Sequence, residues 1–450
     1  MKAGILKIMA FSFVLFLFES CSKSEVVSQS QNTNSDNFQP VATEDIVMYE
    51  INLNAFSTTK NIQGIINRLD NLKALGVNTI WLMPIYPVGA VNSFGSPYCV
   101  REYTSVNPMF GNLQDLQNLV RLAHAKNIAV ILDWVANHTS WDNTWITLHP
   151  EWYTHNAGGQ IISPEGTNWN DVADLNYSNA PMRLAMIDAM KYWVINANID
   201  GFRCDAADYV PYDFWFQATT ALNAIPNKQL ILLAEGNRAD HFAVGFQMNY
   251  AWDFLTAIKN VVGASQTSVA TLFTSNTTEF AAVPSGKQKL RFTTNHDESN
   301  IASPISVYGS KNGAIAASVV TIFMQGVPLL YCGQEVGVSA TATYNGSNTI
   351  DWNANPDMLA TYQKLLGFYI TSSTVRKGTL TSYSNTNVAI FKKTTTSEQV
   401  VVLVNCRATT QNVTLDSTLQ GDWKDVFTNA TVSLAGNVSL TGYQYLILKK

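Results

Sequence analysis

Charged side chains are scarce in this chain of 450 residues. They make up 14% of it, against roughly 25% in an average soluble domain. The 28 basic and 33 acidic residues give a formal net charge of −5, and no block of basic residues stands out along the sequence. Proteins that bind nucleic acids use such blocks to contact phosphates, so no nucleic acid is expected as a partner.

Apolar runs of membrane-spanning length are missing as well. The run at residues 8–18 has 11 residues, short of the roughly 20 that a transmembrane helix needs. It follows Lys2 and Lys7 and precedes Cys21, an order that resembles a bacterial lipoprotein signal. We therefore expect a signal peptide over residues 1–20, lipidation of Cys21, and an exported protein anchored to a bacterial membrane, periplasmic or at the cell surface. An ordinary secretory signal, with Cys21 incidental, is the alternative.

Cysteine is also infrequent, with five residues in the chain. Cys99, Cys204, Cys332 and Cys406 are spaced too widely for a compact disulfide framework. Cys204 and Cys332 lie in apolar runs, so we interpret them as small buried hydrophobic residues. The sequence has neither an H-E-x-x-H zinc motif nor a G-x-S-x-G serine nucleophile motif, which argues against those two hydrolase classes.

Organised sequence begins near residue 45 and alternates between apolar runs and helical patterns. Residues 21–44, rich in Ser, Gln and Asn, predict a flexible linker. Helical stripes, such as 62–75 closed by Gly76, separate many of the apolar runs. Eight runs predict strands: 47–51, 79–84, 129–134, 199–205, 230–235, 246–250, 290–295 and 327–333. The alternation predicts an α/β fold, a parallel (β/α)8 barrel, with a doubly wound sheet as the alternative.

The pattern changes after a helical stretch at 357–370. Short strand-like runs separated by Asn, Thr and Gly follow, and they predict an all-β C-terminal domain of the sandwich type. The expected domains are a catalytic barrel over 45–372, with a short excursion after strand 3 that forms an inserted loop domain at 139–176, and a β domain over 373–450.

Polar residues close four of the predicted strands. An Asp at such a place is usually a helix cap or turn residue, so each is a weak signal alone. Active sites of these barrels lie where strands end, so together the polar groups should converge at one mouth. They are Asp133, Asn137 and His138; Arg203 and Asp205; Glu235; and Asn295, His296 and Asp297.

In these residues the chain resembles the α-amylase family of glycoside hydrolases, over roughly residues 45–450. The four groups match the family's four motif segments in order. The resemblance implies a retaining hydrolase that cleaves α-1,4-glucosidic bonds of starch-like α-glucans or malto-oligosaccharides. It also implies that Asp205 is the nucleophile, Glu235 the general acid and base, and Asp297 the carboxylate that grips sugar hydroxyls in the transition state.

Further roles follow from the same resemblance. Tyr98 would be an aromatic platform for the sugar, and His138, Arg203, Asn295 and His296 would complete the substrate-binding set. Asn137 and Asp174 match positions that hold a structural Ca²⁺ in many relatives, and oxygen ligands suit that ion. Both residues also fit the alternative of capping or turn residues.

Two departures from the family bear on how substrate binds. Cys99 stands where relatives that trim single glucoses carry an aspartate, and a thiol is too weak a hydrogen-bonding group to grip a chain end. Asp208 and Tyr209 replace a lysine–histidine pair that some relatives use for leaving-side sugars. Because of Cys99, and because the short excursion after strand 3 should leave the cleft more open, we expect internal cleavage. The alternatives are an exo-acting α-glucosidase, a cyclomaltodextrinase or a glucan transglycosylase of the same family; a non-catalytic glucan-binding protein is disfavoured because all three carboxylates are present.

Overall fold

The computed structural model describes residue 1 and residues 38–338 and 348–450. The expected signal peptide, the lipidation site Cys21 and most of the expected linker therefore lie outside the described residues. Within residues 38–338 and 348–450 no helix is both long and apolar enough to cross a membrane.

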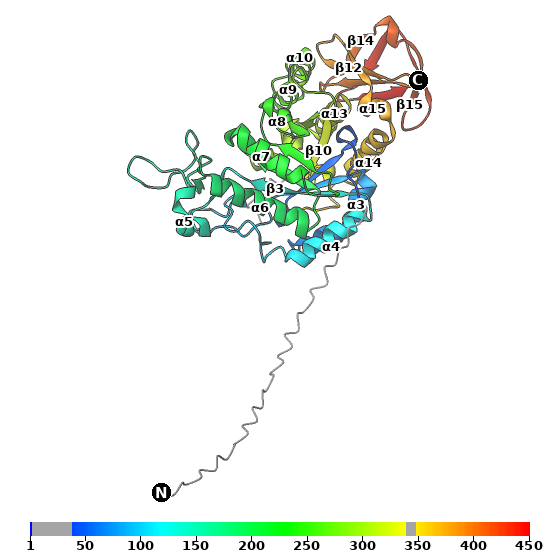
Figure 1. The fold of residues 1–450 in the computed structure, drawn as a ribbon. Coiled ribbons are helices and arrows are strands. Elements are labelled where there is room, and N and C mark those ends of the chain that lie inside the picture. Colours follow the sequence, from blue (N-terminus) through cyan, green and yellow to red (C-terminus); the bar gives the residue numbers. More distant parts are fainter. Residues whose placement is uncertain (2–37, 339–347) are drawn as a thin grey trace. The chain divides into compact units, whose positions relative to one another are not determined.

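A closed barrel of eight parallel strands forms the centre of the fold (Figure 1). Each strand overlaps one of the eight predicted runs, and nearly every strand residue is buried, as expected for strands covered on both faces. In barrel order the strands are β1 (Met48–Ile51), β10 (Val327–Tyr331), β9 (Gln288–Arg291), β8 (Met248–Tyr250), β7 (Ile231–Ala234), β6 (Gly201–Asp205), β3 (Ala129–Val135) and β2 (Thr79–Leu82).

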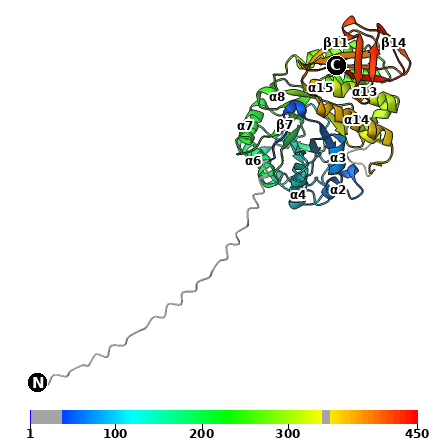
Figure 2. The ribbon, with the colours of Figure 1, turned by 90° about the vertical axis from the view of Figure 1, so that its right-hand side faces the viewer.

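Helices surround the barrel; Figure 2 shows several of them arranged around β7. The larger ones are α4 (Leu113–His124), α6 (Ala180–Asn196), α7 (Tyr212–Asn223), α9 (Trp252–Val262), α10 (Ala270–Phe280), α13 (Lys311–Phe323) and α14 (Pro356–Thr371). Shorter ones are α1 (Leu53–Phe56), α2 (Ile62–Ile66), α3 (Leu69–Leu75), α8 (Asp240–Ala243), α11 (His296–Ile301), α12 (Pro304–Val307) and α15 (Ser373–Lys377).

The single helix expected over 62–75 is two helices, α2 and α3. The chain leaves helical geometry at Arg68 (φ −114°, ψ 6°), whose guanidinium stacks on Trp352 at 3.7 Å from the ring centroid. Gly76 ends α3 with φ +98°, as its position predicts, because this left-handed conformation is strained for residues with a Cβ.

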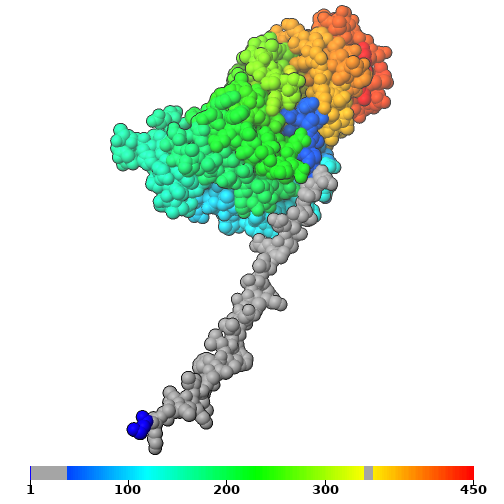
Figure 3. All heavy atoms as spheres, viewed as in Figure 1, coloured from blue at the N-terminus to red at the C-terminus, as the bar shows by residue number. Residues whose placement is uncertain are grey.

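The insertion after β3 protrudes from the barrel surface, in teal in Figure 3. It holds two short antiparallel strands, β4 (His138–Ser140) and β5 (Val172–Asp174), with His138 opposite Asp174. Between them lie α5 (Thr144–Leu148) and a 3-10 turn, Pro150–Trp152. Trp145 packs against Trp152 and Tyr103 at 5.1 Å between centroids, so these aromatic side chains anchor the loop.

The C-terminal domain contains a six-stranded sheet and a two-stranded one, with a core of its own around Trp423. Three of its strands were not predicted, β11, β15 and β17, because exposed polar residues hide their alternation. The six-stranded sheet has the order β11 (Thr379–Tyr383), β12 (Val388–Thr394), β13 (Gln399–Asn405), β18 (Tyr445–Lys449), β15 (Gly421–Asp425) and β16 (Thr431–Leu434). The pair is β14 (Gln411–Thr414) and β17 (Asn437–Leu440).

The start of ordered packing and the state of the cysteines can be compared with the sequence predictions. The linker expected through residue 44 gives way to ordered packing earlier, since Phe38 stacks on His124 at 4.0 Å, and Asp45 just beyond pairs with Arg376 at 2.8 Å. The cysteines of the described chain are free and buried, which confirms the interpretation of Cys204 and Cys332.

Candidate active site

Arg203 lies at the centre of the barrel mouth with its side chain fully buried. Its Nη1 lies 2.8 Å from Asp133 Oδ1 and 2.9 Å from Asp205 Oδ1. Its Nη2 lies 2.8 Å from Glu235 Oε1, an ion-pair contact without hydrogen-bond geometry. Arg203 and Asp205 are two residues apart on β6 and so face the same side, the barrel interior. One guanidinium therefore gathers carboxylates from three strand ends.

Asp133, on β3, contacts Arg203 and two further side chains. Its Oδ2 accepts hydrogen bonds from Trp81 Nε1 and the Tyr98 hydroxyl, each at 3.1 Å. Arg203 Nε in turn donates to the Tyr250 hydroxyl at 3.2 Å. These contacts fix the guanidinium from several sides, so Asp205 and Glu235 meet a preorganised positive charge.

Glu235 follows β7 directly, and its backbone N–H donates to the Cys204 carbonyl on β6 at 2.9 Å. Its Oε2 accepts from the Ala206 N–H at 2.7 Å. Burial raises the pKa of Glu235 to about 7, with help from the negative charges of Asp205 and Asp297 and against the opposing effect of Arg203. A carboxyl group with this pKa can hold a proton near neutral pH.

Asp205 lies in the same buried network, and burial and Arg203 have opposing effects on its pKa as well. Burial raises its pKa to about 6, while Arg203 acts in the opposite direction. Burial thus raises the pKa of both carboxyl groups, and the positive charge of Arg203 opposes the rise in each. Asp297, at the start of α11, is about half exposed (49%) at the rim of this group.

His296 faces these carboxylates from the other side of the mouth. Its Nε2 lies 2.8 Å from the Tyr98 hydroxyl and 3.4 Å from Asp297 Oδ1. The rings of Tyr98 and His296 stack at 5.4 Å. Its Nδ1 lies 2.6 Å from Glu50 Oε1 on β1. Tyr98, the expected sugar platform, and His296, expected to bind substrate, are therefore brought together.

Asn295 caps the helix that carries His296 and Asp297. It is fully buried, and its Oδ1 accepts from the Glu298 N–H at 2.9 Å as the N-cap of α11. Strand β9 ends at Arg291, four residues before Asn295. Asn295 thus sets the start of the helix that presents His296 and Asp297, and its role in substrate binding stays a prediction.

His138 lies next to the backbone of Tyr98 and is almost fully buried. Burial lowers its pKa to about 4, so the ring is neutral near pH 7. Trp169, from the insertion, meets His138 edge to face at 5.7 Å and lies 5.1 Å from the ring of Tyr209. Tyr209 is 54% exposed. Aromatic surface of the kind that sugars contact therefore borders the mouth between the insertion and β6.

Cys99 and Asp208, which depart from the family pattern, both form hydrogen bonds within the protein. The Cys99 thiol is fully buried and donates to Asp171 Oδ2 at 3.3 Å. Asp208 accepts from the backbone N–H groups of Asn237 and Arg238 at 3.0 and 3.3 Å. A Cβ at Gly236 would lie 2.2 Å from Asp208 Oδ1. Asp208 thus braces the loop that follows Glu235.

The residues expected to hold calcium lie side by side, since the Leu175 N–H donates to the Asn137 carbonyl at 3.2 Å and Asp174 precedes Leu175. Asp174 is the one carboxylate of the pair, and Asn137 Nδ2 lies 3.3 Å from His138 Nδ1. Calcium takes six to eight oxygens, and in the described part of the chain no three His, Cys, Asp or Glu side chains converge on a metal position. These two side chains alone do not make up such a set, and calcium stays a prediction.

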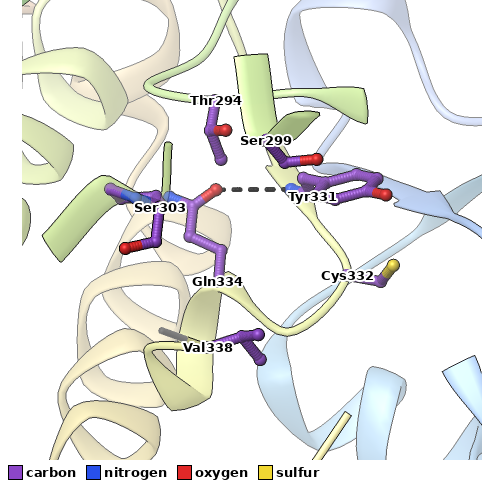
Figure 4. A pocket seen from close by; sticks show the side chains of 8 residues that line it. Thr294, Ser299, Ser303, Tyr331, Cys332, Gln334 and Val338 are labelled. Carbon is purple, nitrogen blue, oxygen red and sulfur yellow. Dashed lines mark hydrogen bonds between the residues drawn. The ribbon is translucent and has the colours of Figure 1, made fainter. Parts of the chain in front are cut away.

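A small cavity lies beside the mouth, between α11 and the end of β10 (Figure 4). Its lining includes Thr294, Ser299 and Gln334 but no carboxylate. Gln334 Oε1 accepts from the Tyr331 N–H at 3.3 Å, the dashed line in Figure 4, and Gln334 Nε2 donates to Thr293 Oγ1 at 2.9 Å. The cavity therefore belongs to the packing behind the mouth rather than to the carboxylate cluster.

Four residues of this site were not assigned roles from the sequence. Asp133 was seen as part of a motif, but its bond to Arg203 was not. Glu50 carried a signal, a charged residue inside the apolar run 47–51. Trp81 and Tyr250 carried no such signal, because an aromatic residue in a barrel strand is indistinguishable from an ordinary core residue in the sequence.

The family model "Alpha amylase, catalytic domain" matches residues 30–158 and 166–400. Alpha-amylase 3 of Dictyoglomus thermophilum is 28% identical over 340 residues, 66% of this chain and 65% of that protein. An α-glucosidase of Apis mellifera is 32% identical over 213 residues, 38% of this chain and 36% of its own. Both matches span less than two thirds of the relative's length.

Among solved structures, a noncanonic maltogenic α-amylase from Thermotoga neapolitana superposes with a TM-score of 0.82 at 26% identity, over 91% of this chain and 99% of that one. An α-amylase from Lactobacillus plantarum gives the same TM-score and the same two shares at 27% identity. The barrel and the β domain are therefore both part of the shared architecture.

Proposed function

Because this chain belongs to the α-amylase family of glycoside hydrolases, we propose that it hydrolyses α-1,4-glucosidic bonds of starch-like glucans with retention of anomeric configuration. The observation that carries the proposal is the set of contacts around Arg203. It places Asp205 and Glu235 on one guanidinium. A retaining mechanism needs two such carboxyl groups close together, about 5 Å apart.

Asp205 is the nucleophile in this proposal. Its carboxylate attacks the anomeric carbon, and the bond to the leaving oxygen breaks as a covalent glycosyl-enzyme forms. Arg203 keeps Asp205 ionised and aimed, because its charge opposes the effect of burial on the carboxylate. Water later releases the sugar from Asp205.

Glu235 supplies the proton for the first step and removes one in the second. It donates its proton to the leaving oxygen, and the resulting carboxylate then takes a proton from the attacking water. Its raised pKa suits both tasks near neutral pH. Asp297, His296 and Tyr98 bind the sugar on the opposite side, where hydrogen bonds to hydroxyls strengthen as the ring distorts.

The cleavage mode that we propose is internal. The Cys99 thiol is buried and bonded to Asp171, so it presents no group that could grip a chain end. Exposed aromatic surface at Tyr209 offers a contact for a chain that continues past the site. On amylose we expect iodine colour to fall early relative to the gain in reducing ends. Glucose as the sole early product, with the iodine complex persisting, would support end-trimming instead.

The reaction class is tested by products from starch, pullulan and cyclodextrins, with Asp205→Asn as the inactive control. Release of malto-oligosaccharides from starch supports hydrolysis, whereas longer products formed from malto-oligosaccharides would indicate a transglycosylase, and preferred opening of cyclodextrins a cyclomaltodextrinase. Proton NMR during the first minutes should show the α-anomer. Initial release of the β-anomer would contradict retention.

A lipid anchor at Cys21 and a bound calcium ion complete the proposal. The apolar run before Cys21 supports the first, and Cys21→Ala should release the protein from membranes; unchanged association would refute it. The backbone contact that brings the segments of Asn137 and Asp174 side by side supports the second. Chelation with EDTA should lower Tm slightly, and added Ca²⁺, but not Mg²⁺, should restore it. An unchanged Tm would remove calcium from the proposal.

A further inference from the structure

Glu50 is a fully buried carboxylate in the first barrel strand. Its Oε1 lies 2.6 Å from His296 Nδ1, and its Oε2 has no hydrogen-bond partner among the described residues. A buried charge is costly unless it is paired. The close contact with the His296 ring is therefore the main interaction that offsets the cost of burying the Glu50 carboxylate.

We infer that Glu50 is a positioning residue that holds His296 as an imidazolium, with Nδ1–H on Glu50 and Nε2–H directed toward the sugar side of the mouth. The inference rests on the proposed function, since it assigns His296 a charged hydrogen bond to substrate. Glu50 itself touches neither the sugar nor the reacting atoms; it acts through the ring.

The contacts of the other ring nitrogen agree with a proton there. His296 Nε2 faces Asp297 Oδ1 at 3.4 Å and the Tyr98 hydroxyl at 2.8 Å. With Nδ1–H fixed on Glu50, a neutral ring would turn a lone pair toward the Asp297 carboxylate, whereas an imidazolium donates to it.

The charged groups around the ring come from four elements: Glu50 on β1, Asp133 on β3, Arg203 and Asp205 on β6, and Asp297 on α11. Burial and Arg203 disfavour the charged ring, but Asp297 and Glu50 outweigh them and raise the pKa of His296 to about 9. The imidazolium in turn lowers the pKa of both Asp133 and Asp205. Glu50 therefore helps to keep the nucleophile ionised without contacting it.

The chain offers a matched control in Glu335, in the turn after β10. It is also buried (3% exposed); its Oε1 accepts from the Tyr49 hydroxyl at 2.7 Å, and its Oε2 has no hydrogen-bond partner in the described residues. Glu335→Gln replaces a buried carboxyl group that does not touch His296. General effects of losing a buried carboxylate should appear in both variants.

The first measurement is NMR of the full chain with ¹⁵N-labelled histidine. His296→Gln identifies the signal of this ring among the six histidines. At pH 7.5 we expect both ring nitrogens of His296 to be protonated. A neutral ring at this pH overturns the inference. The readout needs neither a foldable Glu50 variant nor enzymatic turnover, so it separates this inference from a failure of the proposed function.

The second measurement is the pH profile of kcat/KM for Glu50→Gln. Loss of the imidazolium should raise the pKa of Asp205, so the acid limb should move up by about one pH unit while the alkaline limb stays. KM should rise as the charged hydrogen bond is lost, and Glu50→Asp should recover part of both effects. Glu335→Gln should leave the limbs in place. An acid limb that is unmoved, or moved to lower pH, in Glu50→Gln overturns the inference.

Discussion

Two buried arginines of this molecule, Arg203 and Arg407, differ in the kind of group that each one binds. Arg203, in the barrel, faces the carboxylates of Asp133, Asp205 and Glu235. Arg407, in the C-terminal domain, faces backbone carbonyls, among them Val261 at 2.6 Å and Thr267 at 2.7 Å. Both are nearly inaccessible to solvent, at 0% and 7% exposure.

The difference lies in what the partners can do. A carboxylate can gain or lose a proton, so the field of Arg203 sets which of its partners is ionised at a given pH. A carbonyl has no proton to exchange, so the bonds of Arg407 to residues of α9 and the loop after it can only hold the β domain on the barrel. Burial of an arginine thus marks chemistry only when its partners titrate.

We expect the largest effect on activity when a titrating partner of Arg203 is replaced. Asp205→Asn and Glu235→Gln each keep the side-chain volume and remove a charge or an exchangeable proton. We expect kcat to fall by several orders of magnitude in both, with far-UV circular dichroism and Tm close to those of the parent. Near-normal turnover in either variant would sink the assignment of the carboxylates.

Arg203→Lys tests the guanidinium itself. Lysine keeps the positive charge but cannot reach Asp133, Asp205 and Glu235 together, since it has a single donor nitrogen. A displaced nucleophile should lower kcat/KM by about 100-fold, measured on a soluble maltooligosaccharide. Arg407→Lys is the control, and its kcat/KM should match the parent.

The pH dependence sharpens the comparison further. The pKa of Asp205, raised to about 6, governs the acid limb, because activity is lost as this nucleophile gains a proton. The pKa of Glu235, raised to about 7, governs the alkaline limb, because activity is lost as this acid gives up its proton. The profile of kcat/KM should be a narrow bell centred between these values. A broad plateau from pH 5 to 9 is the contrary result.

Arg407→Ala probes the other arginine and affects stability instead. It strips hydrogen bonds from carbonyls that stay partly buried, which should lower the free energy of unfolding by about 3 kcal/mol. Thermal unfolding by calorimetry measures this loss. At 25 °C the folded fraction should keep the parent's kcat, and a loss of kcat comparable to that of Arg203→Lys would erase the distinction between the two arginines.

Much of this fold could be read from the sequence because barrel strands are buried on both faces and so appear as short apolar runs. The β domain was harder: β15 and β17 are largely exposed strands without such a run. The break between α2 and α3 escaped because the apolar stripe continues through it, and Arg68 leaves the helix for a contact with Trp352, far along the chain.

The candidate site divides in the same way. Asp205, Glu235 and Asp297 were predicted because they lie in motif segments at strand ends that resemble those of the α-amylase family. Glu50 and Asp133 act through side chains that are distant in sequence, His296 and Arg203, and no local pattern reveals such a partner. Asn295 has a structural role that its motif did not predict, since its side chain caps α11.

The brace formed by Asp208 has a consequence for anyone who wishes to change product length. Grafting a lysine–histidine pair onto positions 208 and 209 would remove the acceptor of the Asn237 and Arg238 N–H groups and disturb the loop that follows Glu235. Gly236, which has room for no side chain beside Asp208, is part of the same unit. Residues 208 and 209 therefore cannot be changed without affecting the placement of Glu235, and libraries should vary residues 208, 209 and 236–238 together.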